Sequence, residues 1–139
     1  MITKTYSTIA KDLTQAQAWQ LMSNVDNWKT WDPTVEDAKI AGDFKTGIYF
    51  YLKSKGGPKA KILLAEVKPK TYYRDLARLP LAKMTGEHFF EETPEGLKLM
   101  VTMSISGPLS FLWYRIIMKD IVGRLPEDLK TLIAEAKKI

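Results

Sequence analysis

The last quarter of the chain, residues 107–139, carries the longest periodic pattern of apolar side chains in the sequence. A helix with an apolar stripe of this length cannot stand alone in water, because the stripe must be covered by a surface of similar length. We therefore expect the rest of the chain to form that cover. The stripe is recognised by spacings of three and four, which lay side chains along one face of an α-helix, at Leu109, Leu112, Trp113, Ile116, Ile117, Ile121, Leu125, Leu129, Leu132, Ile133 and Ala136.

Two residues predict that this segment is not one straight helix. Gly123 weakens a helix, and Pro126 lacks a backbone N–H and collides with the carbonyl four residues before it. Pro126 followed by two acidic residues is also a good helix start, since proline suits the first helical position and acids favour the positive end of the helix dipole. We expect a long helix that is kinked or briefly broken at 123–126, with a first part over 108–122 and a second part that ends near 137.

The N-terminal part of the chain predicts one strand followed by two short helices. Residues 2–9 alternate in polarity and are rich in β-branched side chains, which is typical of a strand. Thr14 and Gln17 have the spacing of a capping box, so a helix should start there. Asn24 can cap a further helical turn or two, which must end before Pro33 because the residue before a proline avoids the helical conformation.

Glycine and proline recur at short intervals from residue 35 onward, and the segments between them have the length of strands. The links are too short for crossover helices, so consecutive strands should pair as an antiparallel meander. With the first strand this predicts an α+β fold in a single domain over 1–139, in which a curved seven-stranded antiparallel sheet surrounds the C-terminal helix. The six further strands are expected at 35–40, 48–54, 60–67, 71–78, 83–92 and 97–105.

Alternation along the strands predicts which side chains face the helix. In 48–54 the face of Phe50 is favoured over that of Tyr49 and Tyr51, because Lys53 shares the face of the tyrosines. The segment 60–67 is too uniformly apolar to be assigned. In the last two strands the inward faces are Met84, Gly86, His88 and Phe90, then Leu97, Leu99, Val101, Met103 and Ile105.

Composition narrows the class of protein. An apolar fraction of 45% and a charged fraction of 27% are ordinary for a soluble globular protein. No run of about 18 apolar residues could span a membrane, and the N-terminus lacks the apolar core of a secretory signal. We therefore expect a cytoplasmic protein without stable membrane insertion.

Metal and nucleic-acid sites are not expected. The chain has no cysteine and one histidine, which excludes cysteine-ligated and multi-histidine metal sites, and nothing points to a cofactor. Its 21 basic residues are scattered among 16 acidic ones. The single basic cluster, 53–61, is typical of a solvated hairpin tip, whereas a nucleic-acid surface concentrates its basic residues on one face.

The order of these elements resembles the helix-grip fold of the START-like superfamily, also called SRPBCC or polyketide cyclase/dehydrase. Three stretches carry the resemblance: WQLMSNVDNWKTWDPTV at 19–35, LARLPLAKMTGEHFFEETPEGLKL at 76–99, and SGPLSFLW with GRLPEDLKTL at 106–113 and 123–132. The resemblance implies either a carrier of lipids, hormones or other apolar molecules, or a cyclase or hydrolase that works in the same cavity. Bacterial relatives often carry a second histidine or another polar group where this chain has Leu99, Met100, Val101 and Thr102.

The candidate site residues are those expected on the inner face. His88 is the only side chain here that ordinarily titrates near neutral pH; it could be a general acid/base, a ligand contact or a structural residue. Trp28 and Trp31 are spaced to be neighbours on a helical turn, where they could form a lid over a ligand or plug the end of the sheet. The remaining ligand-binding candidates are Phe50, Phe90, Met103, Trp113 and Ile117.

The two halves of the C-terminal segment are expected to have different roles. Trp113 and Ile117 should lie nearest the pocket, and residues 129–133 should pack on the sheet. Asp120 lies near the apolar stripe, either on an exposed flank or buried with a partner such as Arg124.

The function expected from this sequence is the binding of a small hydrophobic ligand, of lipid, polyketide or aromatic type, in a cavity between the sheet and the C-terminal helix. The alternative is an enzyme of the cyclase or hydrolase type that acts in the same cavity with His88 as general acid/base. A third alternative is an interaction domain whose cavity is filled by its own side chains.

Overall fold

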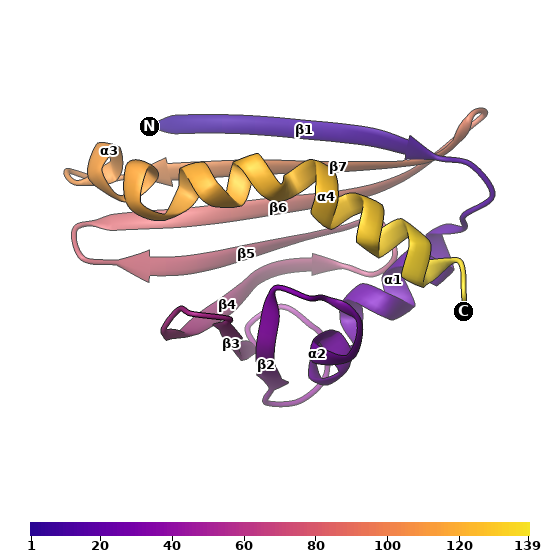
Figure 1. Ribbon diagram of the computed structural model, residues 1–139, viewed down its shortest axis with the longest axis horizontal. Helices are drawn as coiled ribbons and strands as arrows, with labels where there is room; N and C mark the ends of the chain where they lie inside the picture. Colours follow the sequence, from indigo (N-terminus) through magenta and orange to yellow (C-terminus); the bar gives the residue numbers. More distant parts are fainter.

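Seven antiparallel strands form one curved sheet, in which neighbouring strands follow the order β1-β7-β6-β5-β4-β3-β2. The computed structural model describes residues 1–139. β1 pairs with β7, so the first and last strands of the sequence lie side by side (Figure 1). The meander predicted from the short links is confirmed. The strands are β1 (Ile2–Ala10), β2 (Val35–Ile40), β3 (Tyr49–Ser54), β4 (Lys59–Lys68), β5 (Tyr72–Leu79), β6 (Ala82–Thr93) and β7 (Gly96–Ser106).

Two short helices and a single 3₁₀ turn connect β1 to β2, as the sequence predicts. They are α1 (Gln15–Ser23), the 3₁₀ turn η1 (Val25–Asn27) and α2 (Trp28–Trp31). The capping box at the start of α1 is present: the Gln17 amide donates to the Thr14 hydroxyl at 3.1 Å, and the Thr14 amide donates to the Gln17 side-chain oxygen at 2.9 Å.

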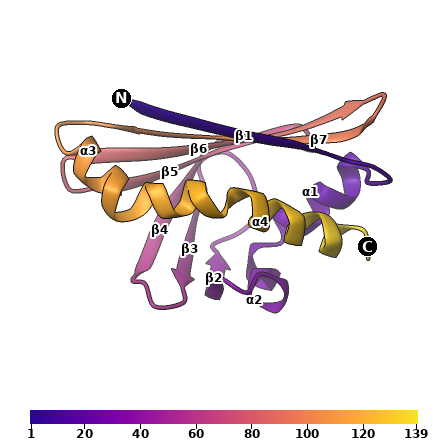
Figure 2. The same ribbon diagram turned by 45° about the horizontal axis from the view of Figure 1, so that its top comes forward.

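The C-terminal segment crosses the sheet as one continuous helical stretch, which Figures 1 and 2 show in orange and yellow. It consists of α3 (Ser110–Trp113), the π-helical turn η2 (Tyr114–Met118) and α4 (Lys119–Ala136). No helix in the structure has the length and apolar character needed to cross a membrane.

Of the two alternatives expected at 123–126, the break is wrong, because α4 continues through Pro126, and the kink remains (Figure 1). Proline removes one backbone hydrogen bond, but the helix is packed on the core on both sides of it through Leu125 and Leu129. The coil of α4 therefore changes direction near its middle without interruption (Figure 1). The irregular turn lies earlier, at η2, where the sequence carries neither glycine nor proline.

The main core lies between the sheet and α4. All five inward positions predicted on β7 are buried, which confirms the alternation. Phe50 is 2% exposed, while Tyr49 and Tyr51 lie on the opposite face of β3 beneath the ammonium groups of Lys61 and Lys59. The prediction that the Phe50 face of β3 points toward the core is therefore confirmed.

Candidate functional site

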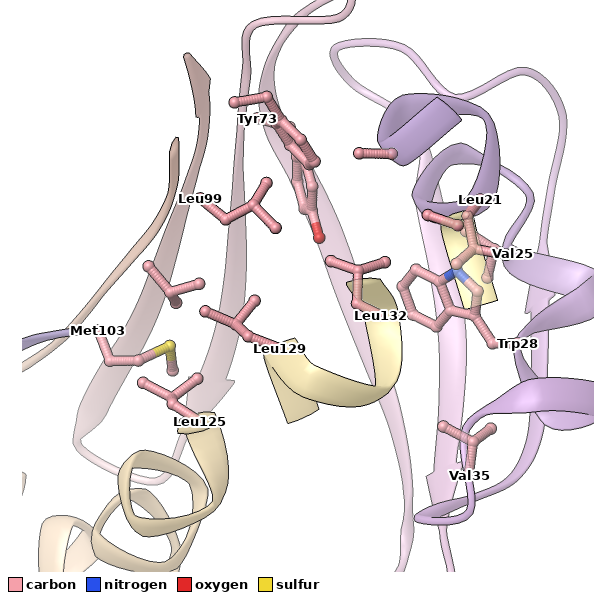
Figure 3. Close-up of a cluster of buried hydrophobic side chains, with 14 of the residues drawn as sticks. Leu21, Val25, Trp28, Val35, Tyr73, Leu99, Met103, Leu125, Leu129 and Leu132 are labelled. Carbon is pink, nitrogen blue, oxygen red and sulfur yellow. The ribbon is translucent and has the colours of Figure 1, made fainter. Parts of the chain in front are cut away.

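A cavity of about 260 Å³ lies between the sheet, α2 and α4. Most of its lining is apolar, and Figure 3 shows several of the side chains around it, with Leu99 and Met103 on the sheet side facing Leu125, Leu129 and Leu132 on α4. The volume falls just below the usual range of roughly 300–1,000 Å³ for sites that hold drug-sized ligands. The space suits a small molecule.

Most of the predicted ligand-binding residues lie around this one cavity. Trp113 and Ile117 lie outside its lining. The residues that line it are Trp28, Trp31, Phe50, His88, Phe90 and Met103.

The prediction that Trp113 and Ile117 lie nearest the pocket is therefore wrong. Trp113 instead anchors α3 to the β5–β6 turn, since its indole N–H donates to the Pro80 carbonyl at 2.8 Å. The π-helical turn η2 adds a residue to the turn after Trp113 and so shifts the phase of the stripe. Phe111 and Ile116 are exposed. The side chains of the C-terminal segment that line the cavity all come from α4: Ile121, Arg124, Leu125, Asp128, Leu129 and Leu132.

The two tryptophans of the α2 turn differ in how they are held. Trp28 is 8% exposed, its indole N–H donates to the Met22 carbonyl at 3.1 Å, and its ring meets Phe50 edge to face at 5.4 Å between centroids. Trp31 is less buried as a residue, but its indole nitrogen is buried and has no hydrogen-bond partner. Trp28 is built into the core, whereas Trp31 leaves a donor unpaired beside the cavity.

A carboxylate and an imidazole are joined on the sheet wall of the cavity. His88 Nε2 and Asp75 Oδ2 are 3.0 Å apart, and Asp75 Oδ1 accepts the Gly86 amide at 3.1 Å. Strand pairing creates this group, because Asp75 lies opposite Gly86 and Tyr73 opposite His88 in the β5–β6 ladder. A Cβ atom at residue 86 would lie 2.8 Å from Asp75 Oδ1, so the glycine provides the room for the carboxylate.

Tyr73 places a hydroxyl in the apolar part of the cavity. The residue is 1% exposed, and its ring stacks on His88 with 4.1 Å between centroids. Figure 3 shows the hydroxyl pointing into the space between Leu99 and Leu132. Burial, and then the Asp75 carboxylate, raise the pKa of Tyr73 well above its usual 10, so the phenol stays neutral and can donate a hydrogen bond.

A second polar group, formed by Asp32, Arg124 and Asp128, lies where α2 meets α4. Asp32 accepts hydrogen bonds from the Thr34 amide and hydroxyl at 2.9 and 2.7 Å. Burial, and then the Asp32 carboxylate, raise the pKa of Asp128, while Arg124 opposes the shift. The Asp128 carboxylate thus lies near the like charge of Asp32, and the positive charge of Arg124 offsets this repulsion only in part.

Four residues of the site were missed by the sequence analysis: Asp32, Tyr73, Asp75 and Asp128. A two-residue turn at Pro80-Leu81 would have placed Asp75 opposite Gly86 by counting along the hairpin. Asp128 continues the spacing of Ile121, Leu125 and Leu132 on one helical face. Because Asp128 was assigned to the start of a second helix, its place in that spacing was not recognised. Asp120, the carboxylate that the sequence analysis considered near the apolar stripe, is exposed.

A wider hollow of about 600 Å³ lies on the outer face of the sheet. It is open to solvent and mostly polar, with Glu66, Lys68, Tyr72 and Glu87 among its lining residues. Tyr72 donates to Glu87 Oε2 at 2.8 Å, and burial together with that carboxylate raises the pKa of Tyr72 to about 12. Since its polar groups already pair with one another, the inner cavity is the better candidate site.

No family model matches the chain, and no curated protein matches it. Solved structures do match. A hypothetical protein of Helicobacter pylori aligns at 12% identity over 97% of this chain and 88% of its own, with a TM-score of 0.78. Ara h 8.0201 aligns at 11% identity over 99% and 100%, with a TM-score of 0.74.

A third similar structure is StfQ, a di-domain ARO/CYC protein from the steffimycin biosynthetic pathway. It aligns at 16% identity over 99% of this chain and 49% of its own, with a TM-score of 0.73. Likenesses at this level of identity show the fold. The chain has the helix-grip fold that the resemblance predicts, a curved seven-stranded antiparallel sheet around a long C-terminal helix.

Proposed function

We propose that the protein binds a small hydrophobic molecule in the cavity between the sheet and α4. The observation that carries this proposal is a largely apolar space of about 260 Å³ that the side chains of the core leave unfilled. Concave, mostly apolar spaces with a few polar groups are the sites in which folded proteins hold small molecules. The fold supports the proposal by analogy only, since one fold hosts many functions.

Native mass spectrometry of the protein as purified, and isothermal titration with a panel of apolar and aromatic compounds, test this proposal. We expect a bound small molecule or micromolar binding of panel members. A cavity-filling variant, Ala77→Leu, should abolish binding because Ala77 lines the cavity. The matched control is Ala134→Leu, at an exposed position of α4.

Two outcomes would overturn the proposal. One is a protein that carries no bound molecule and binds no panel member. The other is an Ala77→Leu variant that folds, as shown by its unfolding curve, and binds as tightly as the wild type.

The second candidate function is general acid/base catalysis in the same cavity, which the contact of His88 with Asp75 favours. A carboxylate that accepts the proton of one imidazole nitrogen fixes the tautomer and makes the other nitrogen the basic one. In this arrangement Nδ1 of His88 would take up the proton.

The ring opening of 5-nitrobenzisoxazole tests this candidate, because the reaction needs only a base that removes the ring C–H proton while the N–O bond breaks to a phenolate. We expect turnover that falls about 100-fold or more in His88→Ala, and falls less in Asp75→Asn. Turnover that survives His88→Ala unchanged rules out this mechanism.

A further inference from the structure

We propose that the ligand of the inner cavity is a compact, uncharged aromatic molecule with a carbonyl-type oxygen, and that the Tyr73 hydroxyl donates a hydrogen bond to that oxygen. This inference rests on the proposed binding function and gives the chemical class of its ligand.

The Tyr73 hydroxyl supplies the first argument. The side chain is 1% exposed, and its hydroxyl points into the cavity without a partner in the protein (Figure 3). A hydroxyl that faces cavity space is almost always hydrogen-bonded, either to water or to a ligand that takes the water's place. A ligand oxygen that accepts from this hydroxyl completes the missing bond. The raised pKa of Tyr73 keeps the group protonated and therefore a donor.

The charges around the cavity supply the second argument. Three carboxylates line it, those of Asp32, Asp75 and Asp128, against the single guanidinium of Arg124. This local excess of negative charge stands out in a chain whose formal net charge is +5. A ligand carboxylate would lose its hydration and meet like charges, so fatty acids and other anions are disfavoured.

Size and shape supply the third argument. A volume of about 260 Å³ has no room for a long acyl chain. Trp28, Phe50 and Phe90 line the cavity together with the stacked rings of Tyr73 and His88. Aromatic side chains contribute additional attraction to rings that pack edge to face or offset against them. A molecule of one or two fused rings is the expected occupant.

A double-mutant cycle between protein and ligand tests the inference. The ligands are 2-acetylnaphthalene, which has the carbonyl oxygen, and 2-ethylnaphthalene, which lacks it. Isothermal titration measures both with the wild type and with Tyr73→Phe. A single hydrogen bond is worth about a 3- to 10-fold change in affinity. We expect Tyr73→Phe to weaken binding of the ketone by that factor relative to the hydrocarbon, and the exposed-site control Tyr51→Phe to change neither.

Two further probes test the charge of the ligand. We expect 2-naphthoate to bind at least about 10-fold more weakly than the ketone, because the carboxylates that line the cavity repel it. The amine 2-(aminomethyl)naphthalene should also bind more weakly, although the carboxylates attract it, because its ammonium group loses its hydration and offers Tyr73 no acceptor. Tighter binding of either ion than of the ketone overturns the assignment of an uncharged ligand.

The outcomes separate this inference from the proposed function. If the ketone and the hydrocarbon bind and Tyr73→Phe weakens both equally, the hydrogen bond to Tyr73 is refuted while the binding function stands. If the wild type binds none of the four probes and no apolar compound of the wider panel, the binding function itself fails.

Discussion

On the sheet wall of the cavity the Asp75 carboxylate is paired, whereas near α2 the Trp31 indole N–H is not. On the sheet wall, Asp75 contacts both His88 and the Gly86 amide. Near α2, the Trp31 indole nitrogen has no partner, and Asp128 has a raised pKa beside Asp32. Neighbouring strands hold the first set in register, while the second set comes from a short helix, a loop and α4. Unpaired groups beside a cavity are the ones that a ligand can satisfy, at some cost to the empty protein.

If Asp75 and His88 form a closely fitted pair, Gly86→Ala should produce the largest loss of stability. A Cβ atom there would lie 2.8 Å from Asp75 Oδ1 and 3.2 Å from both His88 Nε2 and Met103 Sδ, so the carboxylate must leave its two partners. We expect the free energy of unfolding to fall by about 1–3 kcal/mol, measured by urea denaturation.

Gly123→Ala is the control for this substitution, because a Cβ atom there meets nothing within 4 Å and the residue lies inside α4. It should stabilise the protein by about 0.5–1 kcal/mol. Unchanged stability of Gly86→Ala, with unchanged imidazole NMR signals of His88, would show that the pair is not held by the fit at Gly86.

The tryptophans of the α2 turn provide a second test. Trp28→Phe removes the hydrogen bond to the Met22 carbonyl and should cost about 1–3 kcal/mol. Trp31→Phe removes a buried N–H that has no partner. The stability gained by removing this unpaired donor offsets the stability lost with the ring contacts. We expect a change in unfolding free energy between zero and a gain of about 1 kcal/mol for Trp31→Phe. Equal losses in the two variants would contradict the difference in pairing.

The smallest effect is expected at Asp128. Its pKa is raised from an ordinary 3.8, so folding favours the protonated form. The associated stability is complete below the unfolded pKa and is lost as the pH rises through the higher folded value. Asp128→Asn should therefore be more stable than the wild type at neutral pH, by well under about 1 kcal/mol because the group is partly solvated.

Urea denaturation between pH 3 and pH 7 measures this difference, which should shrink toward the acid end of the range. Asp120→Asn, at an exposed position of the same helix, is the control and should show no such trend. A wild type that gains stability relative to Asp128→Asn as the pH rises would reverse the sign of the argument.

Much of the fold could be predicted from the sequence, because strands and amphipathic helices leave a local period. The inward faces of β3, β6 and β7 follow from alternation alone. At Pro126 the helix is kinked but not broken (Figure 1), which shows the limit of local rules. Proline disfavours the helix interior by about 3 kcal/mol, but packing on both sides of it retains the helix, and packing is not visible in the local pattern.

The site was predicted less completely. Phe50, His88 and Phe90 were found because their strands alternate cleanly, and Trp113 and Ile117 were misplaced because no residue pattern marks the π-helical turn η2. The direction in which a helical side chain points depends on every turn before it. One irregular turn therefore rotates all the residues that follow it relative to those that precede it.

Local periodicity was enough to predict the order of the elements, the antiparallel sheet and the residues that face its inner side. The contacts that give the cavity its chemistry depend on residues far apart in the chain. Asp75 meets His88 through the register of two strands, and Asp32 comes near Asp128 because α4 crosses the sheet beside α2. The periodicity of the side chains indicates which face of a strand or helix a residue occupies. Only the packing of the whole chain determines which residues come into contact and what space they leave between them.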